Sequence, residues 1–282
     1  MTKKIAFQGE LGANSHIACH EAYPRYQPLP CPTFEDAFAA LRSGRADLAM
    51  IPIDNSLAGR VADIHHLMPH SGLQIIGEWF LPVQHQLLAT SDATLKTIRT
   101  VESHVHALGQ CRKLIRQLGL KAVVAADTAG SAREVAEAGD NTRASLATAL
   151  AGKIYGLKTL KKDVADDARN TTRFIILSRD KKWAPRGKTP LVTTFVFQVR
   201  NVPAALYKAM GGFATNGVNM TKLESYMING SFVATQFYAD IDGHPDDKHV
   251  AFALEELKFF SKDMKILGVY PAHKFRKTFK AS

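Results

Sequence analysis

The sequence predicts an α/β protein with a large N-terminal region on a mostly parallel sheet, followed by a small C-terminal module of order βαββαβ. In the first 178 residues, short apolar runs of strand length alternate with longer runs of helical periodicity, which is typical of α/β folds. Two prolines, a glycine and five basic residues then interrupt this pattern within residues 179–190. A second series of elements starts at residue 191, so we place a domain boundary in the interrupted segment.

The N-terminal region contains several strand, loop and helix units. The first expected strand covers residues 4–8 and ends at Gly9, and Ser15 is the expected N-cap of a helix that runs to about Tyr23. Further strands are expected at residues 46–51, 73–79, 121–126 and 174–177. Further helices are expected at residues 33–43, 106–118, 131–138 and 145–155. Ligands of such folds bind beyond the carboxyl ends of the strands, which directs attention to the loops at residues 9–15, 52–59, 102–110 and 127–131.

The C-terminal module has its own pattern of elements. Strands are expected at residues 191–199, 218–226, 231–240 and 265–270, with a turn at Asn229-Gly230. One helix opens at Pro203 and stops at Gly217, and another covers residues 247–262. Each helix carries apolar side chains on one face, so both can cover the same side of a four-stranded antiparallel sheet, in the ferredoxin-like arrangement.

Bulk properties exclude several classes of protein. The chain has no apolar stretch of signal-peptide length at its N-terminus and no run of about 18 apolar residues, so we expect a cytoplasmic protein with no membrane partner. Three distant cysteines, Cys19, Cys31 and Cys111, predict neither a disulfide framework nor a thiolate metal site. His16 and His20 have metal-ligand spacing, but no third ligand lies at the expected offset, and we expect no metal.

The formal net charge of +10 suggests a nucleic-acid partner, but its distribution argues against one. Residues 179–190 and 271–282 each carry a net charge of +4, and solvated lysines in a linker and a tail are the usual meaning of such runs. An RNA- or DNA-binding protein would need this charge on one folded face. The nearly balanced remainder still favours anionic substrates through long-range steering.

Four loops carry polar groups that could form a site, although each has an ordinary structural explanation. The glycine-rich loop 9–15 could present backbone N–H groups to a carboxylate, and it fits an ordinary tight turn equally well. In the loop 52–59 a carboxylate, an amide and a hydroxyl follow a strand, but an Asx turn explains them too. Ser103 and Gln110 fit helix capping and surface hydration, and residues 127–131 fit a helix cap.

A fifth segment is more specific, because Asn170-Thr171-Thr172-Arg173-Phe174 resembles the N-x-T-R-F signature of prephenate dehydratases. The four loops are similar to further motifs of that family in the same order. Asp54 stands in the proline-isoleucine-glutamate-asparagine-serine motif where glutamate is usual, and Val105-His106 replaces a proline-glutamine pair between Ser103-His104 and Gln110-Cys111. Residues 127–132 match without change. The resemblance spans nearly the whole chain.

The C-terminal module resembles an ACT domain, a regulatory module that binds amino acids. Pro203-Ala204-Ala205-Leu206 is similar to the glycine-alanine-leucine motif with alanine in place of glycine. Glu224-Ser225-Tyr226-Met227 is similar to the E-S-R-P motif with its last two residues changed. The resemblance implies that the effector-binding residues are Ala204, Ala205, Leu206, Asn219, Glu224 and Ser225.

The resemblance also implies an architecture and an activity. Residues 1–178 would form a catalytic region of two lobes, like a periplasmic binding protein, with the chain crossing near residues 79–82 and returning near residue 160. Residues 179–190 would form a linker, residues 191–272 the ACT domain and residues 273–282 a basic tail. The implied reaction is the decarboxylating dehydration of prephenate to phenylpyruvate, which requires no cofactor. L-Phenylalanine would be the feedback effector, and paired ACT domains would make a homodimer or homotetramer.

Residue roles follow from the matched motifs. Thr172 would donate a hydrogen bond to the leaving hydroxyl group, with Asn55, Ser103 and Gln110 as further catalytic donors that position the substrate. Substrate binding is implied for Ser15, Ser56, Thr128, Arg173 and Phe174. Arg173 equally fits a structural salt bridge, and Phe174 begins an apolar strand typical of a core.

Two other functions stay open at this point. Arogenate dehydratase catalyses the same elimination on the amino analogue of prephenate, and the sequence does not separate a keto from an amino side chain. A non-catalytic receptor for an amino acid or another solute would share a lobed architecture. The expected absence of export and the presence of Thr172 beside Arg173 argue against a receptor.

Overall fold

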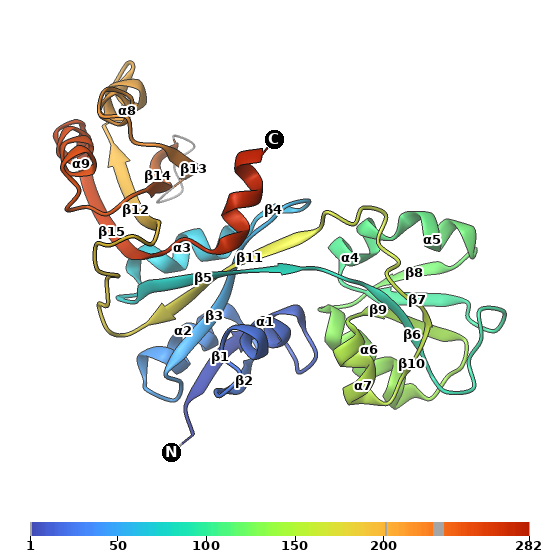
Figure 1. Ribbon diagram of the computed structural model, residues 1–282. Coiled ribbons are helices and arrows are strands. Elements are labelled where there is room, and N and C mark those ends of the chain that lie inside the picture. The colour runs from blue at the N-terminus through green and yellow to red at the C-terminus, as the bar shows by residue number, and fades with distance from the viewer. Residues whose placement is uncertain (1, 201, 228–233, 282) are drawn as a thin grey trace. The chain divides into compact units, whose positions relative to one another are not determined.

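The computed structural model describes residues 2–200, 202–227 and 234–281 (Figure 1). Within these ranges, no helix is long and apolar enough to cross a membrane. The chain falls into two compact units, one formed by Met1–Val61 and Phe80–Phe174 and the other by Ala62–Trp79 and Ile175–Ser282. Strands β5 (Gln74–Pro82) and β11 (Thr171–Ser178) have residues in both units.

The first unit begins with parallel strands that bring two of the predicted loops to one edge. β1 (Lys4–Gln8) pairs in parallel with both β2 (Gln27–Cys31) and β3 (Leu48–Asn55), and β4 (Gly59–Arg60) pairs antiparallel with the end of β3. The connecting helices are α1 (Asn14–Ala22) and α2 (Phe34–Arg42). Because β1 and β3 run in the same direction, the loops that follow them lie at the same edge of the sheet.

The first unit also contains a second, five-stranded sheet of order β10-β6-β9-β7-β8. Its strands are β6 (Gln86–Ala89), β7 (Thr100–Ser103), β8 (Lys121–Val124), β9 (Arg143–Ala147) and β10 (Lys158–Lys161). Its helices are α4 (Val105–Gln110), α5 (Arg112–Gln117), α6 (Thr128–Ala138) and α7 (Ala149–Tyr155). The chain therefore enters this sheet after Pro82 and leaves it after Lys161.

The structure corrects several predicted boundaries in this unit. Residues 145–147 belong to β9 rather than to a helix, because they pair with β6 and β7, and α7 starts only after its Thr148 cap. The predicted helix 106–118 is broken at Cys111 into α4 and α5. Ser15 is not an N-cap, because it lies inside α1, whose N-cap position is Ala13.

Strand β2 is absent from the sequence prediction because two prolines interrupt it. Pro28 and Pro30 lack the N–H group that a central strand must donate. The structure tolerates both because β2 ends the strand order beside β1, so among the described strands none pairs with its other side.

The second unit contains the βαββαβ module. Its strands pair antiparallel in the order β13-β14-β12-β15, which is the ferredoxin-like connectivity. Its elements are β12 (Leu191–Val199), α8 (Ala205–Thr215), β13 (Met220–Met227), β14 (Ala234–Asp242), α9 (Lys248–Phe260) and β15 (Ser261–Pro271). Apolar side chains of α8 and α9 share one buried core with β12 and β14, so both helices cover the same face. The predicted turn Asn229-Gly230 lies outside the described residues.

Residues 62–79 join this module instead of the rest of the N-terminal region. The segment comprises α3 (Ala62–His70) and the first part of β5. Ile75 pairs in parallel with Gly268 of β15, and a Cβ on Gly268 would lie 2.1 Å from the Ile75 carbonyl oxygen, so only glycine fits there. The division into compact units therefore differs from the boundary predicted at residues 179–190. The pairing of Ile75 with Gly268 joins segments that are far apart in the sequence.

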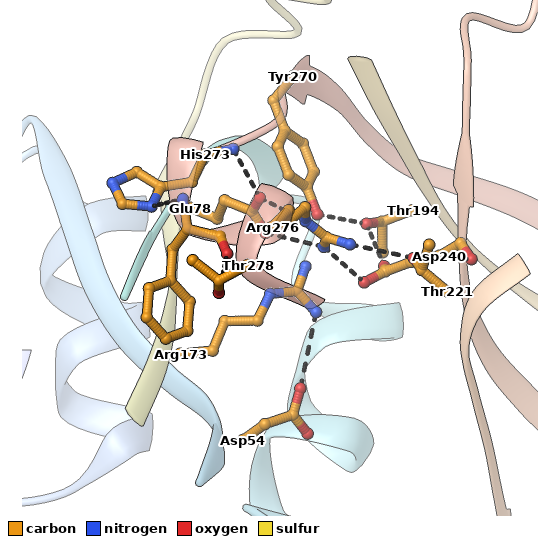
Figure 2. Close-up of polar contacts among 11 residues, drawn as sticks. Asp54, Glu78, Arg173, Thr194, Thr221, Asp240, Tyr270, His273, Arg276 and Thr278 are labelled. Atoms are coloured by element: carbon orange, nitrogen blue, oxygen red, sulfur yellow. Dashed lines mark hydrogen bonds and ion pairs between the residues drawn. The ribbon is translucent and has the colours of Figure 1, made fainter. Parts of the chain in front are cut away.

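The basic tail predicted at residues 273–282 is not simply solvated, because Arg276 of the short helix η1 (Lys274–Ala281) is anchored in the second unit (Figure 2). Its guanidinium donates to both oxygens of Glu78, at 2.6 and 2.9 Å, and lies 3.3 Å from a carboxylate oxygen of Asp240. The side chains of Glu78 and Asp240 are fully buried. Asp240 also accepts a hydrogen bond from Thr194. The Arg276 guanidinium therefore pairs with two buried carboxylates, those of Glu78 and Asp240.

We expect Arg276→Ala to destabilise the second unit strongly. The change removes the cation shared by Glu78 and Asp240, and breaking a buried ion pair in this way costs about 3–5 kcal/mol. Urea denaturation followed by circular dichroism measures the free energy of unfolding. Lys277→Ala, which removes an exposed charge next to Arg276, should change it by less than about 0.5 kcal/mol. Equal effects of the two substitutions would show that Arg276 is not the anchor.

We also expect Ala204→Gly to stabilise the module. Ala204 directly precedes α8 with φ 60° and ψ 18°, a left-handed conformation that favours glycine over alanine. Glycine should therefore raise the free energy of unfolding by about 0.5–1 kcal/mol after its greater unfolded-state entropy is included. Ala205→Gly, within the helix, should lower the same quantity by about 1 kcal/mol, so a loss of stability in both variants would contradict the expectation.

Candidate active site

The candidate site is organised by the side chain of Asn55, the last residue of β3. Its Oδ1 accepts hydrogen bonds from the backbone N–H groups of Leu57, at 3.0 Å, and Ala58, at 2.8 Å. A backbone N–H can only donate, so this Asx turn fixes which end of the amide is oxygen. The Nδ2 group then donates to Asn170 Oδ1, at 2.7 Å, and to Thr172 Oγ1, at 3.0 Å.

A chain of hydrogen bonds continues from Asn170 to two further side chains. Since Asn170 Oδ1 accepts from Asn55, its Nδ2 is free to donate, and it lies 2.7 Å from Gln110 Oε1. Gln110 Oε1 also lies 3.0 Å from His85 Nε2. Asn170 is almost fully buried, and its carbonyl oxygen accepts a hydrogen bond from Val83 N. The chain joins residues from four separate segments of the first unit.

Within the described residues, the hydroxyl group of Thr172 is left with its own hydrogen to donate. Its oxygen accepts from Asn55, and Thr172 is half-buried near the start of β11. Accepting a hydrogen bond polarises a hydroxyl group and makes it a stronger donor to a third group. The geometry therefore presents a neutral O–H donor, which suits stabilisation of a developing negative charge on oxygen.

Ser56 links β3 to the start of β11, and the hydrogen of its hydroxyl group is used in this link. Its Oγ donates to the carbonyl oxygen of Arg169 and accepts from Thr171 N, both at 2.9 Å. Its backbone N–H donates to the carbonyl oxygen of Thr171. We therefore assign Ser56 to holding the Asn170–Thr172 segment in place.

Arg173 pairs with a carboxylate of the protein itself. Its Nη1 lies 3.6 Å from Asp54 Oδ2, and the Arg173 side chain is 8% exposed (Figure 2). This favours the structural salt bridge among the two roles predicted for Arg173. Phe174 is 1% exposed, so the prediction that it contacts substrate is wrong and its interpretation as core is correct.

Three other predicted site residues have no recorded contact with the amide chain in the described structure. Ser103 is fully buried, and its hydroxyl donates to the carbonyl oxygen of Leu146 at 2.6 Å, which contradicts its roles as helix cap and substrate donor. Ser15 is buried in α1, where it has no capping role. Thr128, half-buried, is the first residue of α6.

The glycine-rich loop packs against helices of the second sheet. Arg133 donates to both carboxylate oxygens of Glu10, at 2.9 and 3.0 Å, and these bonds hold the pKa of Glu10 below its usual value. A Cβ on Gly12, which has φ 92°, would lie 2.7 Å from the Cα of Ala151. This close approach, rather than an anion, explains the glycine. A cavity of about 490 Å³ lies beside the loop, lined partly by Asp127 and Tyr155.

The described residues contain no group of three His, Cys, Asp or Glu side chains that could hold a metal ion. His16, one of the two histidines at metal-ligand spacing, accepts a hydrogen bond from Gly12 N through Nδ1 and stacks on Phe7. Burial, together with the charge of His20, lowers the pKa of His16.

The predicted effector residues occupy two parts of the second unit. Ala204, Ala205 and Leu206 open α8, with Ala205 buried and Leu206 packed against the core. Asn219 donates to Asp242 at 2.9 Å just before β13. On β13, Glu224 lies 3.4 Å from Lys222 Nζ, and Ser225 is exposed.

Sequence reasoning missed two members of the amide chain. Asn170 lies within the recognised N-x-T-R-F segment, so its position in that signature was the available signal. His85 lies between β5 and β6 and carries no local motif. Only the fold shows it beside Gln110, which is 25 positions away.

Comparison with known proteins identifies relatives over the whole chain. Residues 5–182 match the family model "Prephenate dehydratase". A protein of Komagataeibacter europaeus described as "Bifunctional N-acyl-homoserine lactone acylase/prephenate dehydratase" is 51% identical over 97% of each chain. "Arogenate dehydratase/prephenate dehydratase 2, chloroplastic" of Arabidopsis thaliana is 35% identical over 95% of this chain and 72% of its own.

A solved structure shares the fold over nearly its full length. The prephenate dehydratase of Arthrobacter aurescens in complex with L-Phe superposes with a TM-score of 0.87. The two chains are 29% identical, and the match covers 99% of this chain and 97% of the other.

We expect the free energy of unfolding to fall as the pH drops below about 6.5. Burial lowers the pKa of His85 and of His16, whereas histidines in an unfolded chain titrate near about 6.5. Below that pH the unfolded chain binds protons that the folded chain does not, so stability is present above this range and is lost below it. Urea denaturation between about pH 7.5 and about pH 5.5 measures the trend, which His85→Gln should make shallower. Constant or rising stability toward pH 5.5 would contradict this.

Proposed function

This chain belongs to the prephenate dehydratase family, whose members are lyases, and we propose that it converts prephenate to phenylpyruvate. The observation that carries this proposal is the Thr172 hydroxyl, whose oxygen accepts from Asn55 and whose hydrogen remains available to a ligand. L-Phenylalanine biosynthesis in the cytoplasm is the corresponding role.

The chemistry needs little beyond orientation and stabilisation of a leaving group. In prephenate, the bond from the ring to its carboxylate breaks and releases carbon dioxide, and that electron pair makes the ring aromatic. The ring C–O bond breaks at the same time, and the oxygen departs with its electron pair as hydroxide, which takes a proton from the solvent to become water. Thr172 is far too weak an acid to transfer a proton fully near neutral pH, so we assign its O–H to a hydrogen bond with the departing oxygen.

The remaining groups of the site would orient the substrate. We propose that the two sheets of the first unit correspond to two lobes and that the substrate binds between them. The Oε1 atom of Gln110 is already held by Asn170 and His85, so its Nε2 group is available as a donor to the substrate. Ser15 and Thr128 stay proposed contacts from the helices that follow the other loops.

Replacing the Thr172 hydroxyl tests the proposed activity. Thr172→Val keeps the shape of the side chain but removes the donor, and loss of one such donor lowers kcat by about 10²–10³-fold. Thr172→Ser retains the hydroxyl and should recover much of that loss. Phenylpyruvate absorbance after addition of prephenate measures turnover, and circular dichroism checks the fold. Near-normal turnover by a folded Thr172→Val protein would refute the assignment.

For the C-terminal module we propose regulation by L-phenylalanine as an ACT domain. The βαββαβ topology and the named L-Phe complex of the Arthrobacter aurescens relative support this proposal. The effector residues would be those at the start of α8 and along β13, and paired modules would form a homodimer or homotetramer. Feedback inhibition then requires that L-phenylalanine bind a less active state more tightly.

The regulatory proposal predicts that L-phenylalanine lowers prephenate turnover and raises the melting temperature, because a ligand that binds only the folded state stabilises it. Glu224→Ala should weaken both effects, whereas D-phenylalanine serves as the matched ligand control. If L-phenylalanine changes neither turnover nor the melting temperature, the regulatory role is refuted. The catalytic proposal would still stand.

Two related activities are distinguished by substrate. The Arabidopsis thaliana relative is named for both arogenate and prephenate, so the ratio of kcat/KM for these two substrates decides the preference.

The relative at 51% identity is also named as an N-acyl-homoserine lactone acylase, which makes amide hydrolysis of such lactones a second candidate activity. Liquid chromatography of the released homoserine lactone tests it, with Thr172→Val showing whether the two reactions share a site.

A further inference from the structure

We propose that His85 is a positioning residue, which holds the Gln110 amide so that its Nε2 group donates to a substrate at the Thr172 site. This inference rests on the proposed function, since it concerns a donor of the same site. His85 is 3% exposed and lies just before β6, where its backbone carbonyl oxygen accepts from Val164 N. Within the described residues its side chain makes no hydrogen bond to Thr172, so it reaches the site through Gln110.

The directions of these hydrogen bonds follow from a single starting point. Leu57 and Ala58 N–H groups must donate, so Asn55 presents oxygen to them and nitrogen to Asn170. Asn170 must then present oxygen to Asn55 and nitrogen to Gln110. Gln110 must present Oε1 to Asn170. Because the same Oε1 faces His85, the histidine Nε2 must carry the proton.

The other ring nitrogen of His85 supports a neutral imidazole. Nδ1 is buried and has no hydrogen-bond partner in the described part of the chain. A proton on Nδ1 would be a buried donor without an acceptor, which is unfavourable by about 1–3 kcal/mol. Burial correspondingly lowers the pKa of His85. The ring therefore acts as a donor through Nε2 and not as an acid or base.

The two hydrogen bonds to Gln110 Oε1, from Asn170 and His85, have two consequences for the site. With Oε1 fixed by two donors, the Gln110 amide cannot rotate by half a turn, and its Nε2 group stays directed away from Asn170 and His85. Asn170 in turn keeps a strong acceptor for its own amide group and stays oriented toward Asn55. Loss of the His85 donor would leave the Gln110 amide held by Asn170 alone in the described structure, so its Nε2 group would no longer keep one direction.

His85→Leu and His85→Gln form the matched pair of substitutions. Leucine fills similar space without a donor, whereas glutamine can place an amide N–H near the position of Nε2. We expect His85→Leu to lower kcat by about 10–100-fold, the usual range for losing an orienting partner, with a smaller change in KM. His85→Gln should restore kcat to within about threefold of the wild type. A wild-type kcat in His85→Leu, or equal losses in both variants, would overturn the proposal.

A double substitution separates positioning from a general effect on packing. In a Gln110→Ala background the amide donor is gone, so adding His85→Leu should lower kcat far less than it does in the wild type. A loss of the same factor in both backgrounds would show that His85 acts by some other route. Circular dichroism and thermal unfolding of each variant check the fold.

A measurement that needs no turnover keeps this inference distinct from the proposed function. Nitrogen-15 NMR of the imidazole rings in the wild-type protein, with His85→Gln used to assign the signal, reports which nitrogen is protonated. We expect the Nε2–H form of His85 at neutral pH, and a Nδ1–H form or an imidazolium would overturn the inference even if prephenate is turned over. An Nε2–H form without prephenate turnover would refute the proposed function and, with it, the catalytic purpose of the positioning.

Discussion

The two hydrogen bonds from Leu57 and Ala58 N–H to Asn55 Oδ1 set the direction of each hydrogen bond in the amide chain. Without them, the Asn55 amide could rotate, and Thr172 could donate its hydrogen to Asn55 Oδ1 instead of to a ligand. The turn after β3 therefore makes the hydroxyl group of a residue 117 positions away an acceptor toward Asn55. Thr172 then keeps its hydrogen for a ligand, and the bond that it accepts makes it a stronger donor.

In the second unit, charged side chains hold separate segments together. Glu78 and Asp240 come from separate strands and are both fully buried, and Arg276 contacts both. Burying carboxylates is unfavourable unless they are paired and hydrogen-bonded, so the fold of this unit depends on the placement of η1 near the end of the chain. The amide chain of the first unit involves no such desolvation of charge.

The sequence alone predicts site roles for Asn55, Gln110 and Thr172, because each lies in a recognisable motif next to a strand or helix end, and the structure joins the three through Asn170. The sequence could not identify His85, since nothing near this residue distinguishes it from an ordinary buried histidine. In the sequence, Ser103 fits a helix cap because it lies between a strand and a helix, whereas in the structure it is fully buried and its hydroxyl donates to Leu146 of β9. The sequence places Arg276 in a basic run that is expected to be solvated, because its partner Glu78 is 198 positions away. In each case, tertiary contacts override a local pattern.

The departures from the family motifs fall on supporting positions. Asp54 has one methylene fewer than glutamate and reaches Arg173 only at 3.6 Å, a weak contact that leaves the amide chain untouched. Val105 is the first residue of α4, a position where proline is favoured because its missing N–H has no intrahelical partner, and Gln110 still ends that helix. Ala204 adopts a backbone conformation suited to glycine. These changes weaken the framework, whereas the side chains that orient Thr172 fit the motif without change. We therefore expect these departures from the motifs to affect stability and the proposed response to an effector more than the chemical step.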